Sequence, residues 1–597
     1  MGFVPIWDLG CGDADDNRTS PYGTRWDSLI FFNVLEFSYL KAVLAFLALI
    51  IMPALLVGVA PSIIFTYSHH TLGTIVSLGR NPTLILLLIL AALLLVPLWA
   101  GPRFLAIAID NFWHLHYTLV FPIFVVLREI LKTVSERFPG KKYEQKHIHY
   151  RRLVATILAA FLLGGAGLAL AVSVELSIGL SLVDAERVAP WAVARAALGN
   201  AAMVFGFSTA VASTFWLWRE LSVNEPVLDW PHPRQPATSL LRVAHMSDLH
   251  VVGERYGYRM ETGTHGAQGN QCVYAAFERL SAIHSSRPLH RVLVTGDITD
   301  AGTRAEWTEF LDLLSHFPEL RSRMSLVPGN HDINIVDRTN TARPDLPWSA
   351  GKALRKLRFV SALDQIQGER AHLVDHKSGA LGPSLAHYLR DGERPRLLRE
   401  LAEYGSLRGR LEIAKVWKAI FPLVEPAVED EGYGVILLDS IAPSNVSLTN
   451  AVGVVSPTQL RALRSVLKGS NPGAWLILLH HQVVEYPVLG ITLRDRIGLA
   501  LMNGPDLLAT ITPHAARTVV LHGHRHVDWV GITGDTVLCS APSVTLGPDE
   551  YRGRFIIHEF SVSPTSRIQV TANERVKVSP TLDSRDNIDQ DRPREAA

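Results

Sequence analysis

Cysteine is scarce in this sequence, and its spacing excludes two kinds of site. The chain has 597 residues but only three cysteines, Cys11, Cys272 and Cys539. They lie far apart and none belongs to a Cys-x-x-Cys pair, so we expect neither a disulfide framework nor a cysteine zinc site. The same scarcity fits a reducing compartment. The sequence also shows no charged segment followed by a short apolar core and a small-residue cleavage site, so no removable signal peptide is expected.

An excess of charge of either sign is missing as well. The 57 Lys and Arg nearly balance the 56 Asp and Glu, which leaves a net charge of +1. No long basic face or interleaved aromatic platform accompanies this balance, so a nucleic-acid partner is not expected. In contrast, hydrophobic residues make up 48% of the chain and the mean hydropathy is +0.18. This length predicts two or more domains, and this composition predicts that one of them lies in a membrane.

Four long apolar runs predict an all-α transmembrane domain over residues 41–220. Each is about long enough to cross the roughly 30 Å of a hydrocarbon core, and none contains a lysine. The stretch 104–131 has a shorter apolar part. It is interpreted as an interfacial segment, and a fifth span is the alternative. The predicted spans are residues 42–65, 83–100, 153–174 and 191–218.

Basic residues concentrate in one loop of this domain. Eight Lys and Arg but only three Glu lie from Arg128 to Arg152, whereas the loops around Arg80 and Arg187 carry one basic residue each. The positive-inside rule therefore places the basic loop in the cytoplasm. With four spans, both termini and the second domain are then cytoplasmic too. The expected localisation is the cell membrane, as a multi-pass protein, with the lipid bilayer as a partner.

Beyond a proline-rich linker at 221–239, the sequence changes to alternating strands and helices. This alternation predicts an α/β domain over residues 240–575. A charged, helix-rich insertion at about 337–432 is interpreted as a cap near the site. Residues 1–40 are assigned no chemistry, and the polar tail 576–597 is expected to be disordered. The expected strands are residues 240–244, 291–295, 324–327, 435–438, 475–479, 518–521, 536–539 and 554–560.

Five clusters of metal-ligand residue types follow apolar runs in this domain. All stand at the C-terminal ends of expected strands, where open α/β sheets place their sites. Carboxylates and imidazoles together suit Zn, Fe or Mn. Seven candidate ligands are too many for one four-coordinate ion, but about right for two ions bridged by a carboxylate and a hydroxide, an arrangement suited to phosphoryl groups. The clusters are Asp248-Leu249-His250, Gly296-Asp297, Gly329-Asn330-His331-Asp332, His480-His481 and Gly523-His524-Arg525-His526.

This ordered set resembles the calcineurin-like metallophosphoesterases over about residues 240–565. The resemblance implies a double-sheet α/β sandwich flanked by helices and a metal-dependent phosphoric ester hydrolase. It implies that His331 contacts phosphate and protonates the leaving oxygen, with Asp332 orienting it. It also implies two metal sites that share Asp297: one holds Asp248, His250, Asp297 and His526, and the other Asp297, Asn330, His480 and His524.

Smaller features make the resemblance more specific. Residues 296–300 (Gly-Asp-Ile-Thr-Asp) and 438–440 (Leu-Asp-Ser) are similar to the branch that contains class III cyclic-nucleotide phosphodiesterases and glycerophosphodiesterases. Prolines usually follow the histidine pair in that branch, whereas Gln482 follows here. His481 therefore stays open as an alternative ligand to His480. Arg525 is a candidate phosphate contact or a solvent-facing residue, and Asp300 is interpreted as a cap or turn residue.

The function predicted from these features is a membrane-anchored, bimetallic phosphoesterase, in the first place a phosphodiesterase. Its substrate is either a cyclic nucleotide or another small phosphodiester, or a lipid-linked phosphodiester or pyrophosphate at the inner membrane face. The alternative of another class is a membrane sensor or scaffold whose phosphoesterase domain only binds. That alternative predicts lost ligands, and the sequence retains the full set. Nothing in the sequence indicates an oligomeric state.

Overall fold

A computed structural model describes the chain in segments that form two compact units. One unit spans Ser38–Val223 with Leu489–Ile497, and the other contains the remaining residues. The predicted spans 42–65 and 83–100, residues 1–40, most of the linker and nearly all of the tail lie outside the described residues. The described residues are 121–137, 145–178, 190–221, 239–253, 270–334, 350–427, 432–442, 451–469, 473–484, 501–546, 553–563 and 566–578.

The first unit is helical where it is described. It contains α5 (Phe121–Arg137), α6 (Gln145–Ile178) and α7 (Pro190–Leu221). Two segments, Tyr150–Ser177 of α6 and Arg195–Trp218 of α7, are long and apolar enough to cross a membrane. They coincide with the predicted spans 153–174 and 191–218. Helix α5 begins near the end of the stretch 104–131 and has 17 residues.

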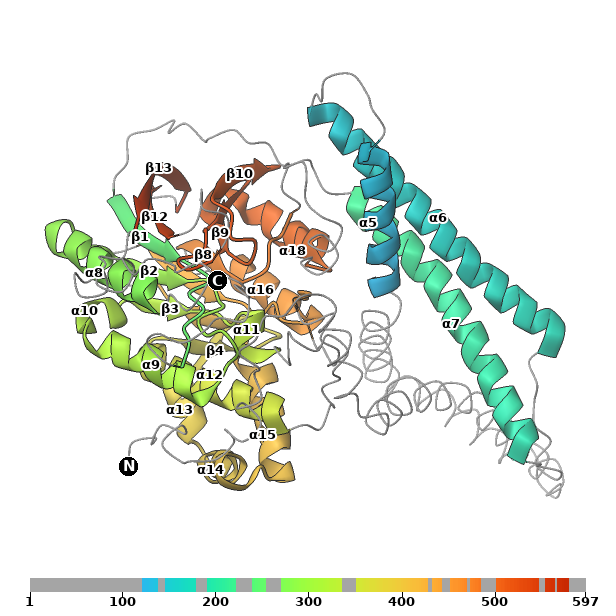
Figure 1. Ribbon diagram of the computed structural model, residues 1–597, viewed down its shortest axis with the longest axis horizontal. Coiled ribbons are helices and arrows are strands. Elements are labelled where there is room, and N and C mark those ends of the chain that lie inside the picture. Colours follow the sequence, from blue (N-terminus) through green and yellow to red (C-terminus); the bar gives the residue numbers. More distant parts are fainter. Residues whose placement is uncertain are drawn as a thin grey trace, which may run out of the picture. The chain divides into compact units, whose positions relative to one another are not determined.

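Helices α6 and α7 lie side by side along a seam of small residues (Figure 1). A Cβ added to Gly206 would lie 2.4 Å from the carbonyl oxygen of Gly167, so only glycine allows this approach. Alanines such as Ala171 are buried beside it, whereas large apolar side chains such as Phe161 and Val211 are exposed. Small residues between helices and large apolar residues outside are the pattern of helices that pack in lipid.

The substitution Gly206→Leu is expected to force α6 and α7 apart, because its side chain would overlap the backbone at Gly167. Overpacking of this kind costs about 1–3 kcal/mol. Gly165→Leu is the matched control, since nothing lies within 4 Å of a Cβ at that position. The melting temperature of the detergent-purified chain should fall for Gly206→Leu alone. Equal melting temperatures for the two variants would contradict the close seam.

The second unit contains two β-sheets. The five-stranded sheet has the order β13-β12-β1-β2-β3, and the eight-stranded sheet has the order β10-β11-β9-β8-β7-β6-β4-β5. Strands β1, β2 and β3 are parallel to one another, as are β7, β8, β9 and β11. The strands are β1 (Ser239–Met246), β2 (Arg291–Val294), β3 (Met324–Leu326), β4 (His372–Val374), β5 (Leu381–Ser384), β6 (Leu423–Glu425), β7 (Tyr433–Leu437), β8 (Ala474–Leu478), β9 (Thr518–His522), β10 (Trp529–Thr533), β11 (Thr536–Ser540), β12 (Arg554–Val562) and β13 (Ile568–Lys577).

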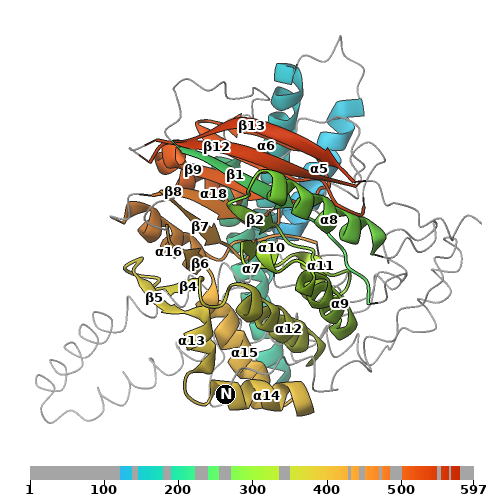
Figure 2. The same cartoon turned by 90° about the vertical axis from the view of Figure 1, so that its left-hand side faces the viewer.

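Helices cover the sheets on two opposite sides (Figures 1 and 2). Helices α8 (Gln271–Ser286), α9 (Arg304–Ser315) and α10 (Pro318–Arg321) lie on one side, and α16 (Pro457–Lys468) and α18 (Gly504–Ile511) on the other. A buried apolar core that includes Phe277, Trp307 and Phe555 fills the space between the layers. The predicted double-sheet α/β fold flanked by helices is therefore confirmed. All eight expected strands are present, each within two residues of its expected ends.

The region predicted as an insertion is helix-rich where it is described, and it also contributes strands. Its helices are α12 (Ala350–Gln367), α13 (Leu385–Arg390), α14 (Arg394–Tyr404) and α15 (Leu407–Ile420). Strands β4, β5 and β6, which the sequence pattern did not reveal, extend the eight-stranded sheet. They have only three or four residues each, too few to show an alternating pattern.

The end of helix α12 and the turn after it cover the β3 edge of the five-stranded sheet. The backbone N–H of Leu326 in β3 donates to Gln367 Oε1 at 2.7 Å, and the guanidinium of Arg370 donates to the carbonyl of Met324. Across the two sheets, Ser325 Oγ donates to the buried carboxylate of Glu425 at 3.0 Å. Because the insertion satisfies these backbone groups, it is an integral part of the sandwich. Its proposed role as a cap stays a prediction.

Candidate metal centre

The five clusters converge on one place in the α/β unit, as the sequence predicted. They occupy the loops that follow β1, β2, β3, β8 and β9, at the C-terminal ends of parallel strands from both sheets. The backbone N–H of Asp248 donates to the carbonyl of Gly296 at 3.1 Å, and Gly523 N–H donates to the carbonyl of His480 at 3.0 Å. Neighbouring loops of each sheet are thus joined by backbone hydrogen bonds. The loops of one sheet face those of the other.

The backbone at these positions is unusual. Among the described residues, six that are not glycine have a positive φ, and five of these six are predicted ligands. Such a conformation costs about 1–3 kcal/mol per residue and persists only where the surroundings enforce it. In the loops after β1 and β9, two residues with a positive φ are separated by a single residue. The five are Asp248 (φ 53°), His250 (φ 45°), Asp297 (φ 49°), His524 (φ 71°) and His526 (φ 54°).

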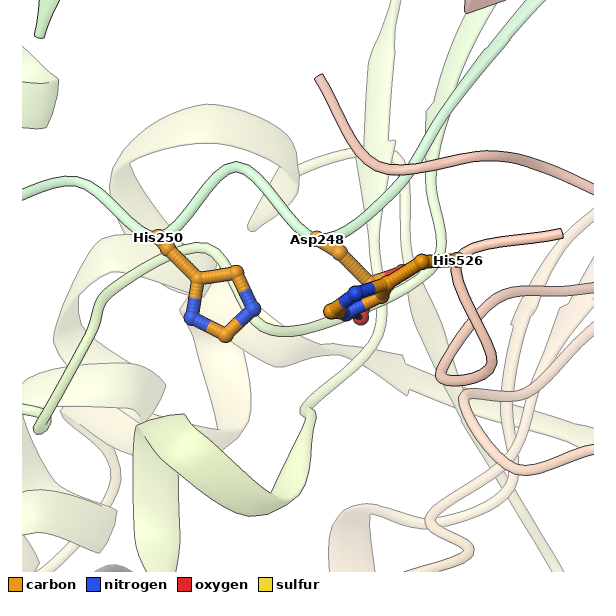
Figure 3. A group of neighbouring side chains, drawn as sticks. All are labelled: Asp248, His250 and His526. Carbon is orange, nitrogen blue, oxygen red and sulfur yellow. Dashed lines mark ion pairs between the residues drawn. The ribbon is translucent and has the colours of Figure 1, made fainter. Parts of the chain in front are cut away.

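One group of potential ligands comprises Asp248, His250 and His526. Each offers a nitrogen or oxygen atom, and these three atoms lie within 4.8 Å of one another. Asp248 and His250 project to the same side of the loop after β1, and His526 reaches Asp248 from the loop after β9 (Figure 3). His526 Nε2 lies 3.2 Å from Asp248 Oδ1. The other oxygen of Asp248 accepts the backbone N–H of His524 at 3.0 Å, which fixes the carboxylate.

A second group comprises Asp297, His480 and His524, whose potential ligand atoms also lie within 4.8 Å of one another. His480 Nε2 lies 3.2 Å from Asp297 Oδ2 and 3.0 Å from His524 Nδ1. The amide oxygen of Asn330 is 3.1 Å from the same His480 nitrogen. All four residues are buried. The four ligands that the resemblance implies for the second metal therefore meet around one point.

Asp297 stands between the two groups. Its Oδ2 lies 3.9 Å from His250 Nε2 and 3.2 Å from His480 Nε2, and its Oδ1 accepts the backbone N–H of His331 at 2.8 Å. A Cβ added to Gly329 would lie 2.1 Å from this oxygen, so the turn after β3 needs glycine to reach the carboxylate. This geometry is consistent with Asp297 as the bridging ligand.

Two of the ligand histidines have a partner for the ring nitrogen that points away from the cluster. His480 Nδ1 lies 2.7 Å from the carbonyl oxygen of Thr295, and His250 Nδ1 lies 3.2 Å from Asp300 Oδ1. Such contacts fix the orientation of a ligating imidazole and leave its other nitrogen toward the metal. Ser440 Oγ accepts the backbone N–H groups of His480 and His481, both at 3.2 Å. The sequence did not reveal these roles of Thr295, Asp300 and Ser440.

Of the two adjacent histidines, the geometry favours His480 as the ligand. His481 Nδ1 is 2.9 Å from Ser440 Oγ, and its ring packs against the His524 ring at 4.5 Å between centroids. Burial lowers the pKa of His481 to about 3, and the neighbouring His480 adds to this effect. His481 is thus a neutral residue that supports the ligand loops, and none of the ligand groups among the described residues includes it.

The histidine predicted to contact phosphate is oriented differently from the expectation. His331 Nδ1 lies 2.7 Å from the backbone carbonyl oxygen of Asp300, and the Asp300 carboxylate is 3.9 Å away. Asp332 instead accepts the N–H and the hydroxyl of Thr299 at 2.9 and 2.7 Å and the N–H of Gly329 at 2.9 Å. These contacts correct the prediction that Asp332 orients His331. Asp332 holds the two turns together, and Asp300 makes the contact with the ring.

The electrostatics of the cluster favour a bound cation. Burial raises the pKa of Asp297, but His480 and His331 more than offset it, so this pKa lies well below its ordinary value. Conversely, burial lowers the pKa of His480, but Asp297 and Asp248 raise it to about 9. The carboxylates therefore stay charged, and His480 holds a proton that a metal cation would displace. Nitrogen and oxygen donors of this kind fit Zn, Fe or Mn, and the set fits a pair of such ions.

Arg525 lies between the two histidines of the loop after β9 and is half-buried. Its backbone N–H donates to the carbonyl of Gly523 at 2.9 Å. Its predicted contact with phosphate remains a prediction.

Comparison with known proteins finds a likeness to one family. Residues 241–528 match the family described as calcineurin-like phosphoesterase. Over 126 residues the chain is 31% identical to a protein of Synechococcus sp. named "Probable cyclic nucleotide phosphodiesterase", a match that covers 21% of this chain and 45% of that protein. A protein of the same description from Coxiella burnetii is 31% identical over 99 residues, covering 16% of this chain and 35% of that protein.

The chain thus spans less than half of the length of these curated relatives. Among solved structures, a dimetal phosphatase from Danio rerio is 15% identical in sequence, with a TM-score of 0.30. That similarity covers 57% of this chain and 99% of that one.

The substitution Asp300→Asn is expected to loosen His250, whose Nδ1 lies 3.2 Å from the Asp300 carboxylate. It also removes the negative charge 3.9 Å from His331 Nδ1, while the backbone contact to that ring remains. Loss of such a supporting contact typically lowers metal affinity or activity about 10–100-fold. Competition with a fluorescent chelator measures the affinity, and Asp312→Asn, on the exposed face of α9, is the control. If both variants bind metal and turn over substrate like the unsubstituted chain, Asp300 does not position the site.

Proposed function

We propose that this chain, which carries a calcineurin-like phosphoesterase domain, is a membrane-anchored hydrolase of phosphodiesters that uses two metal ions. The observation that carries the proposal is the buried carboxylate of Asp297, which lies within 4 Å of histidines from two separate ligand groups. The family match of residues 241–528 and the names of the relatives support the reaction class. The residues proposed to hold the metals are Asp248, His250, Asp297, Asn330, His480, His524 and His526.

Two such ions, when bound, supply an activated water and neutralise the charge of the phosphate. The protein's own contribution is to hold the ligands and to position a proton donor. His331 Nδ1 lies 2.7 Å from the Asp300 carbonyl oxygen, and Nε2 is the nitrogen proposed to meet the substrate. In the protonated ring, Nε2–H can donate to the leaving oxygen of the ester, and the nearby Asp300 carboxylate stabilises that positive charge. Arg525 is proposed as an additional phosphate contact.

The membrane anchor is supported by the helical unit. Two helices have the length and composition to span a bilayer, and their contact surface is made of small residues while large apolar residues face outward. The basic residues from Arg128 to Arg152 lie mostly at the end of α5 and the start of α6, and they support a cytoplasmic location for these helix ends. We therefore place the catalytic domain on the cytoplasmic side.

Replacing the proposed bridging ligand is expected to abolish hydrolysis. Asp297→Ala removes the carboxylate that lies near histidines of both groups, so the full chain with Mn²⁺ should lose essentially all turnover of bis-p-nitrophenyl phosphate. Wild-type turnover should disappear with a chelator and return when Mn²⁺ is added back. His316→Ala, an exposed histidine on the same unit, should behave like the wild type. A wild type without chelator-sensitive turnover would contradict hydrolysis and favour the binding-only sensor.

The substrate class is tested separately. The names of the relatives favour a cyclic nucleotide or another small phosphodiester, whereas the apolar helices favour a lipid-linked phosphodiester or pyrophosphate. We expect the reconstituted chain to hydrolyse 3′,5′-cyclic AMP with a higher kcat/KM than it shows for releasing head groups from a phosphodiester lipid in mixed micelles. The reverse order, abolished by Asp297→Ala, would assign the lipid-linked substrate instead.

A further inference from the structure

The hairpin formed by α14 and α15 exposes apolar residues in a way that the rest of the α/β unit does not. Among the described residues of this unit, five large apolar side chains are exposed, and the three most exposed lie within residues 404–411. These are Tyr404 (78%), Leu407 (64%) and Leu411 (58%), compared with Leu381 (42%) and Leu240 (39%). Single exposed apolar residues are normal on protein surfaces, but three such residues within eight positions of the chain need an explanation.

Two of the three apolar residues lie in a stripe along α15, and Tyr404 is the last residue of α14. Leu407 and Leu411 are one helical turn apart, and exposed basic residues occupy the same side of the helix. The opposite side is buried through Ile413, Val416 and Ile420 and packs toward α12. The hairpin is therefore firmly held, and its outer stripe is presented in a fixed orientation. The exposed basic residues of the stripe are Arg408, Lys415 and Lys418.

The charge of the hairpin is also one-sided. Residues 394–418 contain seven Arg and Lys but three Glu, within a chain whose net charge is only +1. Surface ion pairs use part of this charge. They include Arg394–Glu412 at 3.3 Å, Arg396–Glu400 at 3.7 Å and, within the stripe, Lys415–Glu412 at 3.4 Å. Even so, the basic residues outnumber the acidic ones by more than two to one. The surface is thus complementary to an anionic partner.

We infer that the α14–α15 hairpin docks on an anionic lipid bilayer, with Tyr404, Leu407 and Leu411 in the interfacial layer and the basic residues at the head groups. An amphipathic helix with apolar residues flanked by Lys and Arg binds such an interface. A protein partner fits less well, because apolar centres of protein interfaces are depleted of lysine, whereas here basic residues alternate with the leucines. The inference rests on the proposed membrane anchoring, which brings the surface to a bilayer.

The docking is tested on the full chain reconstituted in lipid nanodiscs, at one chain per disc. In a Cys11→Ser background, whose remaining Cys272 and Cys539 are buried, Leu411→Cys is labelled with the environment-sensitive fluorophore NBD. We expect its emission to shift to shorter wavelength in discs of phosphatidylcholine with phosphatidylglycerol, and to be quenched by a nitroxide lipid. Discs of phosphatidylcholine alone should give a smaller shift. The same label at Leu381→Cys, exposed on β5, is the matched control and should not respond.

The basic residues are tested by the double substitution Arg408→Gln and Lys415→Gln. Each basic side chain at an anionic surface contributes about fivefold to binding, so the docking equilibrium should fall about 25-fold. Lys377→Gln with Lys468→Gln, two exposed lysines elsewhere on the unit, should leave it unchanged. Turnover of bis-p-nitrophenyl phosphate on the same discs should be unaffected by all these substitutions.

Two results would overturn the inference: a label at Leu411→Cys that the nitroxide lipid does not quench, or a shift that appears only when two chains share a disc. The second result would assign the hairpin to a contact between copies. Failure of the anchor is distinguished by an alkaline wash, which would release the chain from the discs. Failure of the proposed hydrolysis is distinguished by absent turnover in a chain whose label still responds.

Discussion

The architecture of the candidate site depends on the burial of one charged carboxylate. Asp297 is almost completely removed from solvent, and an isolated buried carboxylate would take up a proton rather than remain charged. It remains charged because His480, His331 and His250 surround it. Each of those histidines comes from a different loop. The loops after β1, β3 and β8 must therefore all end within reach of the loop after β2, which fixes the register of both sheets at this edge.

This constraint also explains where the backbone adopts strained φ angles. Five predicted ligands have a left-handed backbone, and the cost of about 1–3 kcal/mol for each must be offset by the surroundings. Backbone hydrogen bonds between neighbouring loops supply part of that offset, for example from His250 N–H to the carbonyl of Asp297 at 3.0 Å. The carboxylate of Asp332 supplies another part by binding the turn at Thr299 and the turn at Gly329. The left-handed backbone thus lies where the parallel strands of the two sheets end beside each other, and among the described non-glycine residues it occurs elsewhere only at Ser566.

The sequence predicted the strands and the convergence of the clusters because both depend on local patterns. An apolar run that ends in Asp-x-His or Gly-Asp places its polar residues at the carboxyl edge of a strand, whatever the rest of the chain does. The supporting contacts were not predictable in this way. The contact to His480 is a backbone carbonyl at Thr295, which has no sequence signature, and Asp300 looks like any turn residue until the fold brings it to two histidines. Asp332, adjacent to His331 in sequence, was the more obvious partner and the wrong one. Strands β4 to β6 are too short to show a period, and β13 is rich in polar residues.

The two units place small and large apolar residues in opposite ways. In the α/β unit, large side chains such as Trp307 and Phe555 are buried, because water drives them inward. In the helical unit, glycine and alanine form the seam while Phe161 and Leu176 are exposed, and the proposed membrane anchor accounts for this difference, since lipid does not drive large apolar side chains inward. The α14–α15 hairpin packs like the rest of the α/β unit on its buried side and resembles the helical unit in its exposed apolar stripe. A surface with both properties is suited to the boundary between water and lipid, where apolar and basic groups each find the partner they need.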